Sequence, residues 1–84
     1  MKPVKFKIHE LLKEQDPVTG ETYSGDEVYL GKRSTEDAAI RYAVRMAPKC
    51  YEVQVRAYDQ REELTDHWFI KGLPDGMINI NKIL

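Results

Sequence analysis

Strict alternation of apolar and polar residues is the feature that most restricts what this chain can fold into. It is clearest in the stretch 4–9, VKFKIH, and in the stretch 51–58, YEVQVRAY. A period of two places successive side chains on opposite faces of a β-strand, so each stretch predicts a strand with one buried and one solvent-exposed face. The segments 27–31, EVYLG, and 67–72, HWFIKG, predict two further strands.

The segments between these strands are predicted to be loops, with one more strand at the end. Residues 16–27, DPVTGETYSGDE, are rich in Asp, Pro, Thr and Gly and predict a long hairpin loop. The charged stretch 59–66 predicts a second loop or the tip of a hairpin, and LPDG at 73–76 predicts a tight turn. Residues 77–84, MININKIL, alternate isoleucine with asparagine and predict a short fifth strand that returns along the fourth.

A single helical pattern separates the second and third strands. Ser34 or Thr35 is placed to cap the helix, and two acidic residues follow in its first turn. Apolar side chains then recur at helical spacing on one side: Ala39, Tyr42, Ala43 and Met46. Pro48 ends the pattern.

The order of these elements predicts the fold class. Two strands, a helix and at least two more strands (ββαββ) predict an α+β fold, a two-layer sandwich with one helix on one face of a mostly antiparallel sheet of four to five strands. The chain has 84 residues, so residues 1–84 are predicted to form a single domain. In so small a domain nearly every large apolar side chain must be used in the core.

Composition argues against several classes of protein. The formal net charge is −1, which gives little overall attraction to nucleic acid or to anionic membranes. One cysteine cannot form an intrachain disulfide, and no apolar run exceeds three residues. We therefore expect a cytoplasmic protein that does not contact a membrane.

Few residues could carry catalysis or hold a metal. Cys50, His67 and Asp66 could be combined into a nucleophile, a base and an orienting group, but no motif fixes their geometry, and a buried cysteine is an ordinary core residue. The two histidines and the cysteine match no common metal-ligand spacing. The sequence therefore predicts no enzyme, no metal and no cofactor.

Residues 28–43 carry the one resemblance to a known family. The residues concerned are Tyr29, Leu30, Gly31, Ser34, Glu36, Asp37, Ala38, Ala39 and Tyr42. This segment resembles the last strand and the following helix of AP2-type DNA-binding domains, which implies a helix that lies closely on a sheet. That family reads DNA through arginines and tryptophans on a three-stranded sheet; residues 9–27 here contain neither, and further strands are predicted after the helix. The resemblance therefore implies a shared way of packing.

Two surfaces are candidates for binding another macromolecule. The first is the sheet face opposite the helix, where aromatic and basic side chains would gather: Lys5, Lys7, Tyr29, Arg56, Tyr58 and Phe69. Such mixtures are enriched at protein interfaces, although cross-strand pairing alone could also explain them. The second is a basic helix surface that could bind nucleic acid: Lys32, Arg33, Arg41, Arg45 and Lys49.

These observations predict a small non-enzymatic binding module. Another protein is the favoured partner and nucleic acid is the alternative. The size and the long polar loops suit a small regulatory or inhibitory protein of the kind that phages and mobile elements encode. A monomer is favoured over a homodimer, because the tight turn at 73–76 directs the last strand back into its own sheet.

Overall fold

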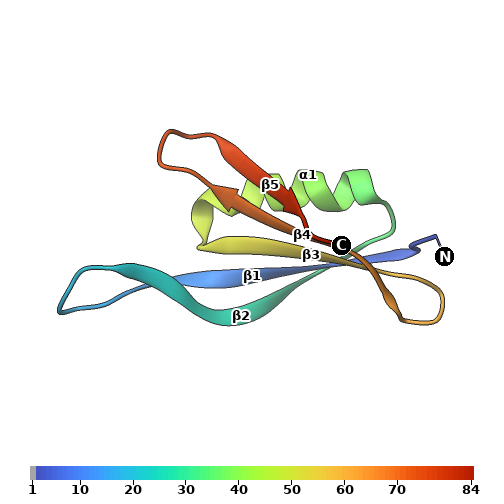
Figure 1. Ribbon diagram of the computed structural model, residues 1–84, viewed down its shortest axis with the longest axis horizontal. Coiled ribbons are helices and arrows are strands. Elements are labelled where there is room, and N and C mark those ends of the chain that lie inside the picture. The colour runs from blue at the N-terminus through green and yellow to red at the C-terminus, as the bar shows by residue number, and fades with distance from the viewer. Residues whose placement is uncertain (1) are drawn as a thin grey trace.

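Five strands form one antiparallel sheet, and one helix lies across one face of it. A computed structural model describes residues 2–84. The elements are β1 (Lys5–Gln15), β2 (Thr22–Arg33), α1 (Glu36–Met46), the 3-10 helix η1 (Ala47–Lys49), β3 (Glu52–Tyr58), β4 (Leu64–Gly72) and β5 (Ile78–Lys82). The strand order is β2-β1-β3-β4-β5, with α1 on one side of the sheet (Figure 1). The α+β prediction is confirmed.

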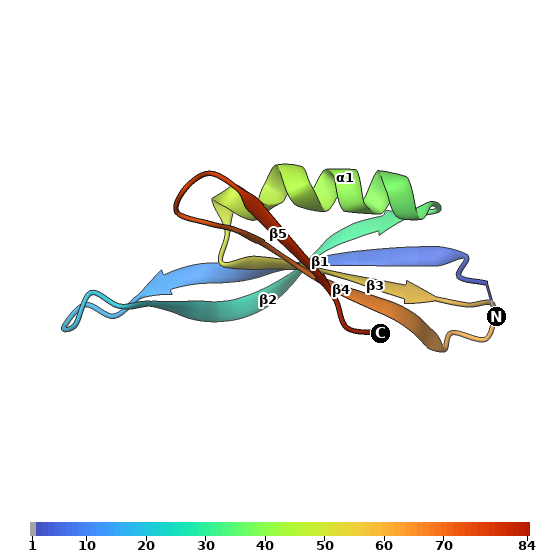
Figure 2. The ribbon, with the colours of Figure 1, turned by 45° about the horizontal axis from the view of Figure 1, so that its top comes forward.

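The core lies between α1 and the sheet. Ala39 and Ala43 of the helix are fully buried, and so are the β-branched side chains that face them from the sheet: Ile8, Val53, Val55 and Ile70. Small residues on the helix let it lie close to the pleated sheet, where burial of each large aliphatic side chain stabilises the fold by about 1.5–3 kcal/mol. The alternation of the strands thus produces one buried face of the sheet. Figure 2 shows the helix lying over the sheet.

The helix begins where the sequence indicated. Thr35 is the N-cap: its backbone is extended, and its hydroxyl oxygen accepts a hydrogen bond from the backbone N–H of Ala38 at 3.2 Å. Glu36 and Asp37 occupy the first turn, where carboxylates complement the positive end of the helix dipole. Of the two predicted capping residues, the structure uses Thr35.

The chain end pairs within its own sheet. β5 lies antiparallel to β4, with Ile80 opposite Ile70 and Ile78 opposite Gly72, and the N–H of Ile83 donates to the carbonyl of His67 at 2.9 Å. The predicted fifth strand is therefore confirmed. Within residues 2–84, no helix is long and apolar enough to cross a membrane.

The hairpin predicted between the first two strands is present, but its loop is shorter than the predicted range 16–27. β1 and β2 continue as a paired ladder to Gln15 and Thr22, and the turn spans only residues 16–21. In that turn the carboxylate of Asp16 accepts the N–H of Val18 at 2.8 Å, and Gly20 takes a positive φ of 77°. Here the two strands extend past the helix as an uncovered arm (Figure 1). Neither face of the arm is buried, so apolar residues are not required at every second position.

The second predicted loop is also shorter than expected, because β4 begins at Leu64. Asp59 closes the remaining turn: its Oδ1 accepts the backbone N–H groups of Arg61 at 2.8 Å and Glu63 at 3.1 Å. Donation by the Glu63 N–H is the main reason why the pKa of Asp59 lies below its ordinary value. The Asp59 carboxylate thus satisfies backbone N–H groups of the turn, which allows the connection between β3 and β4 to be short.

Candidate binding surface

The sheet face opposite α1, here called the open face, carries all six residues predicted for a protein interface. Lys5 lies opposite Tyr58 and Lys7 lies opposite Arg56 in the β1–β3 register. Their neighbours in sequence, Phe6 and Ala57, are buried on the helix side, so the pleat points these side chains the other way. The views in Figures 1 and 2 show no helix on this side of the sheet.

A bulge in β2 shifts the alternation of its side chains between the two faces of the sheet. Ile8 pairs with Gly31 and the next residue, His9, pairs with Tyr29, so Leu30 is an extra residue between two registers. Leu30 packs against the core, while Tyr29 lies beside His9 on the open face, with ring centres 5.2 Å apart. Gly31 has a φ of 133°, which side chains rarely allow, so a glycine suits this position.

Arg56 occupies the middle of the open face and is held in place. Its Nη2 donates to Oε1 of Glu27 at 2.6 Å and to Oε1 of Gln54 at 2.8 Å. The same Gln54 oxygen lies 3.0 Å from Nε2 of His67, and Nδ1 of His9 lies 3.7 Å from Glu27. A fixed arginine loses little conformational freedom when a partner binds.

Burial and the charge of Arg56 keep the two histidines neutral. Partial burial is the main cause that lowers the pKa of His9 and of His67, and the Arg56 guanidinium lowers both further. Glu27 opposes this effect by favouring the protonated ring. Around neutral pH these imidazoles therefore present flat, uncharged surfaces beside a permanent charge.

A row of cations crosses three strands of the open face. Lys7 lies directly opposite Lys32 on one side and directly opposite Arg56 on the other. The adjacent Lys5 donates to Glu62 at 2.6 Å; this hydrogen bond is the main cause that lowers the pKa of Glu62, and Lys7 and Lys32 add to it from nearby. Like charges in directly opposite positions destabilise a sheet, so repulsion within the row lowers the free energy of unfolding.

Aromatic rings frame this row. The ring of Phe69 stacks on His67 with centres 4.6 Å apart, and the ammonium nitrogen of Lys7 lies 5.2 Å from the centre of the Tyr58 ring. Tyr29 is 53% exposed. The open face therefore combines cations, neutral imidazoles and aromatic rings that are already oriented by their neighbours.

The five residues predicted to bind nucleic acid do not form one patch. Lys32 lies on the open face, whereas Arg33 points to the helix side, with its guanidinium carbon 4.7 Å from the centre of the Tyr42 ring. Arg45 lies 5.7 Å from the same ring. The other two are apart: Arg41 pairs with Asp37 along the helix, and Lys49 is exposed at the end of η1.

The three residues considered for catalysis are also separated. Asp66 and His67 are successive residues of β4 and point to opposite faces; Asp66 pairs with Lys82 at 3.0 Å, while His67 contacts Gln54. Cys50 is buried at the end of η1, and its thiol points toward the carbonyl oxygen of Met46 at 3.4 Å. In the part of the chain that the structure describes, no cluster of three or more histidine, cysteine or acidic side chains could hold a metal.

The predicted protein interface did not include Lys32, Glu27 or Gln54, which the structure places on the open face. Lys32 was assigned to the other face because simple alternation along β2 does not allow for the extra residue at Leu30. The glycine that follows Leu30 was the available signal, since an isolated glycine in a strand often marks a bulge.

Comparison of this chain with protein-family models, with curated proteins and with solved structures found no match.

Proposed function

We propose that this chain is a small non-enzymatic binding module of the cytoplasm that recognises another protein through its open face, in a regulatory or inhibitory role. One observation carries the proposal: a cation row framed by aromatic rings lies on the sheet face that α1 leaves uncovered. Arginine and tyrosine are enriched among the side chains that dominate protein-binding energy.

The charges already present on the face favour a protein over a nucleic acid. Glu27 binds Arg56 and Glu62 binds Lys5, so two carboxylates lie among the cations. A phosphate backbone would be repelled by both, whereas a protein surface can match a mixed pattern residue by residue. The divided basic cluster on the helix side gives nucleic acid a weaker alternative site.

The expected contact on the partner is acidic. In residues 2–84, no carboxylate lies within salt-bridge distance of Lys7 or of Lys32, so the row keeps unmatched positive charge. Carboxylates of a partner placed opposite this row would remove the repulsion that the isolated domain tolerates. Binding should therefore weaken as salt concentration rises.

Affinity capture with two double variants, one on each side of the domain, tests the proposal. The sheet variant combines Tyr29→Ala with Lys32→Glu, both at exposed positions of the open face. The helix variant combines Arg41→Glu with Arg45→Glu, both exposed on the opposite side of the domain. All lysates are divided and half is treated with nuclease.

The wild type and the helix variant should retain the same protein after nuclease treatment, and the sheet variant should lose it. Both variants should keep the circular dichroism spectrum and melting temperature of the wild type within a few degrees, because their changed side chains face water. Loss of the captured protein in the helix variant alone, or its release by nuclease, would contradict the proposal.

A further inference from the structure

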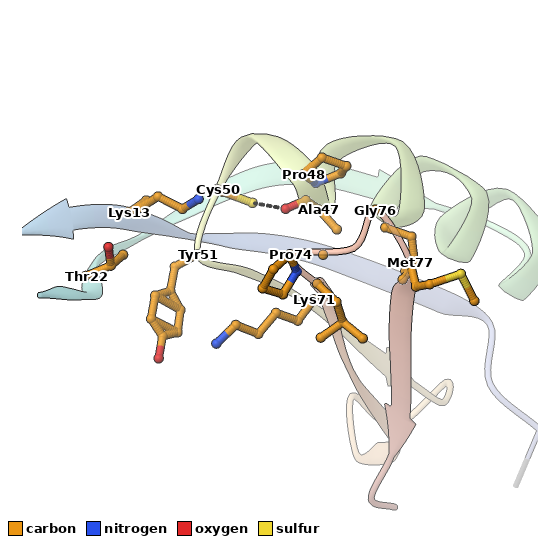
Figure 3. A pocket seen from close by; sticks show the side chains of 13 residues that line it. Lys13, Thr22, Ala47, Pro48, Cys50, Tyr51, Lys71, Pro74, Gly76 and Met77 are labelled. Carbon is orange, nitrogen blue, oxygen red and sulfur yellow. Dashed lines mark hydrogen bonds between the residues drawn. The ribbon is translucent and has the colours of Figure 1, made fainter.

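A second site lies away from the open face, where η1 meets the turn between β4 and β5. A cleft of about 580 Å³ opens there, lined by thirteen residues (Figure 3). We call it the η1 cleft. Its lining includes Ala47 and Cys50 at η1, and Met77 and Ile78 where the β4–β5 turn leads into β5. Sites for small molecules usually enclose about 300–1,000 Å³, so the η1 cleft has a suitable size.

Backbone contacts fix both walls of the η1 cleft. Gly72 of β4 lies so close to η1 that an added Cβ would be 3.3 Å from the Cα of Pro48. The N–H of Tyr51 donates to the carbonyl of Leu11 at 2.9 Å, and the N–H of Leu73 donates to the carbonyl of Met77 at 2.8 Å. These backbone contacts hold η1 against the end of β4 and close the turn between β4 and β5.

The floor of the η1 cleft is apolar. Ala47 is 1% exposed and Cys50 is 4% exposed. Burial raises the pKa of the Cys50 thiol, and Glu10, which lies nearby outside the lining, raises it further; Lys13 acts in the opposite direction. The thiol is therefore uncharged near neutral pH and adds to the apolar floor.

The charged side chains in the lining of the η1 cleft are both positive, while Glu10 and Glu52 act on the Cys50 thiol from outside the lining. Lys13 and Lys71 are its two charged members, and none of the described lining residues carries a carboxylate. The ammonium nitrogen of Lys71 lies 4.0 Å from the centre of the Tyr51 ring, and Lys13 extends toward Cys50 in the same view (Figure 3). An apolar floor beneath two lysines is complementary to a ligand with an apolar body and one negative group.

From this geometry we infer that the η1 cleft binds a small amphipathic carboxylate, such as a medium-chain fatty acid. The hydrocarbon chain lies over Ala47, Cys50 and Ile78, and the carboxylate meets Lys71 beside the Tyr51 ring. The inference is independent of the open face, because no residue of the cation row lines the η1 cleft.

Titration of the full chain with sodium octanoate, followed by amide NMR, tests the inference. Octanoate should shift the amide signals of Cys50, Gly72 and Met77, and octanol should bind at least tenfold more weakly because it lacks the charge. Lys71→Met keeps the apolar stem and should weaken octanoate binding about tenfold. Lys49→Met is the matched control, because Lys49 adjoins Pro48 without lining the η1 cleft, and it should bind as the wild type does.

Variants at a second position distinguish a loss of binding from a loss of folding. Met77 is 63% exposed, so Met77→Glu should fold normally and should weaken octanoate binding by placing a carboxylate in the lining, whereas Met77→Leu should bind as the wild type does. Equal affinity for octanoate and octanol, or an affinity that Lys71→Met and Met77→Glu leave unchanged, would overturn the inference. So would the absence of any shift in these amides at millimolar octanoate.

Discussion

The two faces of the sheet are built from alternate residues of the same strands, yet they are organised in different ways. On the helix side, aliphatic side chains such as Val53 and Val55 are fully buried. On the open side, the residues between them, Gln54 and Arg56, are joined by hydrogen bonds and ion pairs to side chains on neighbouring strands.

This difference separates the main source of stability, on the helix side, from the surface that we propose for recognition. Burial of apolar area is the main source of folding free energy, and the helix side supplies it. The open side instead places like charges opposite one another, which lowers stability. The cation row opposes folding, while the hydrogen bonds and the ion pair of Arg56 on the same face support it. In the function proposed above, a bound partner would relieve the repulsion within the row.

The largest expected effect compares adjacent residues of β4 that point to the two faces. Trp68 is 5% exposed and packs on Phe6, so Trp68→Ala should cost about 3–5 kcal/mol, much of the stability of a small domain. Phe69→Ala on the open face should cost only about 1 kcal/mol. Urea denaturation of both variants measures the contrast; equal losses would show that the open face also holds the fold together.

A smaller effect concerns the cap that positions α1 over the covered face. Thr35→Ala removes the acceptor for the Ala38 N–H and should cost about 1 kcal/mol. Ser34→Ala is the control, because the adjacent hydroxyl is not the cap, and it should change stability by less than about 0.5 kcal/mol. If urea denaturation finds the order of these two costs reversed, the assignment of the cap is wrong.

The smallest effect is a pH dependence that belongs to the open face. The pKa values of His9 and His67 are lowered in the folded state, so the unfolded chain binds protons first as pH falls. Stability should therefore decline as pH drops below about 6.5, the ordinary pKa of histidine, and continue to decline until the folded-state pKa values are passed. Asp59 and Glu62, whose pKa values are lowered, add a separate loss only in the acid range of carboxylates.

Urea midpoints between pH 8 and pH 5 measure the histidine effect, and a variant with His9→Gln and His67→Gln should show a flatter profile. An unchanged slope in that variant would assign the pH dependence to other groups.

Much of this organisation could be predicted from alternation alone. Regular alternation in β1 and β3 indicated the strands and their faces, because a buried face selects apolar residues at every second position. The arm of β1 and β2 was missed for the same reason, since nothing covers it and its hydrogen bonds are made by backbone groups that any residue carries. Lys32 was misplaced because one extra residue reverses the alternation.

The η1 cleft could not be predicted, because its lining comes from segments far apart in the chain. Lys13, Cys50 and Lys71 carry no shared motif and meet only after β1, β3 and β4 have paired. Their proximity depends on the strand order of the sheet, which local patterns do not specify.

The uncovered arm has a consequence for how this domain opens. β1 passes through the core at Phe6 and Ile8 and ends at the exposed Gln15, so one strand runs from the most protected part of the domain to one of the least. Its outer hydrogen bonds can break and re-form without any loss of buried apolar contact, whereas those near Ile8 can open only when the core does. We therefore expect amide hydrogen exchange to be faster at the outer end of the arm than near Ile8.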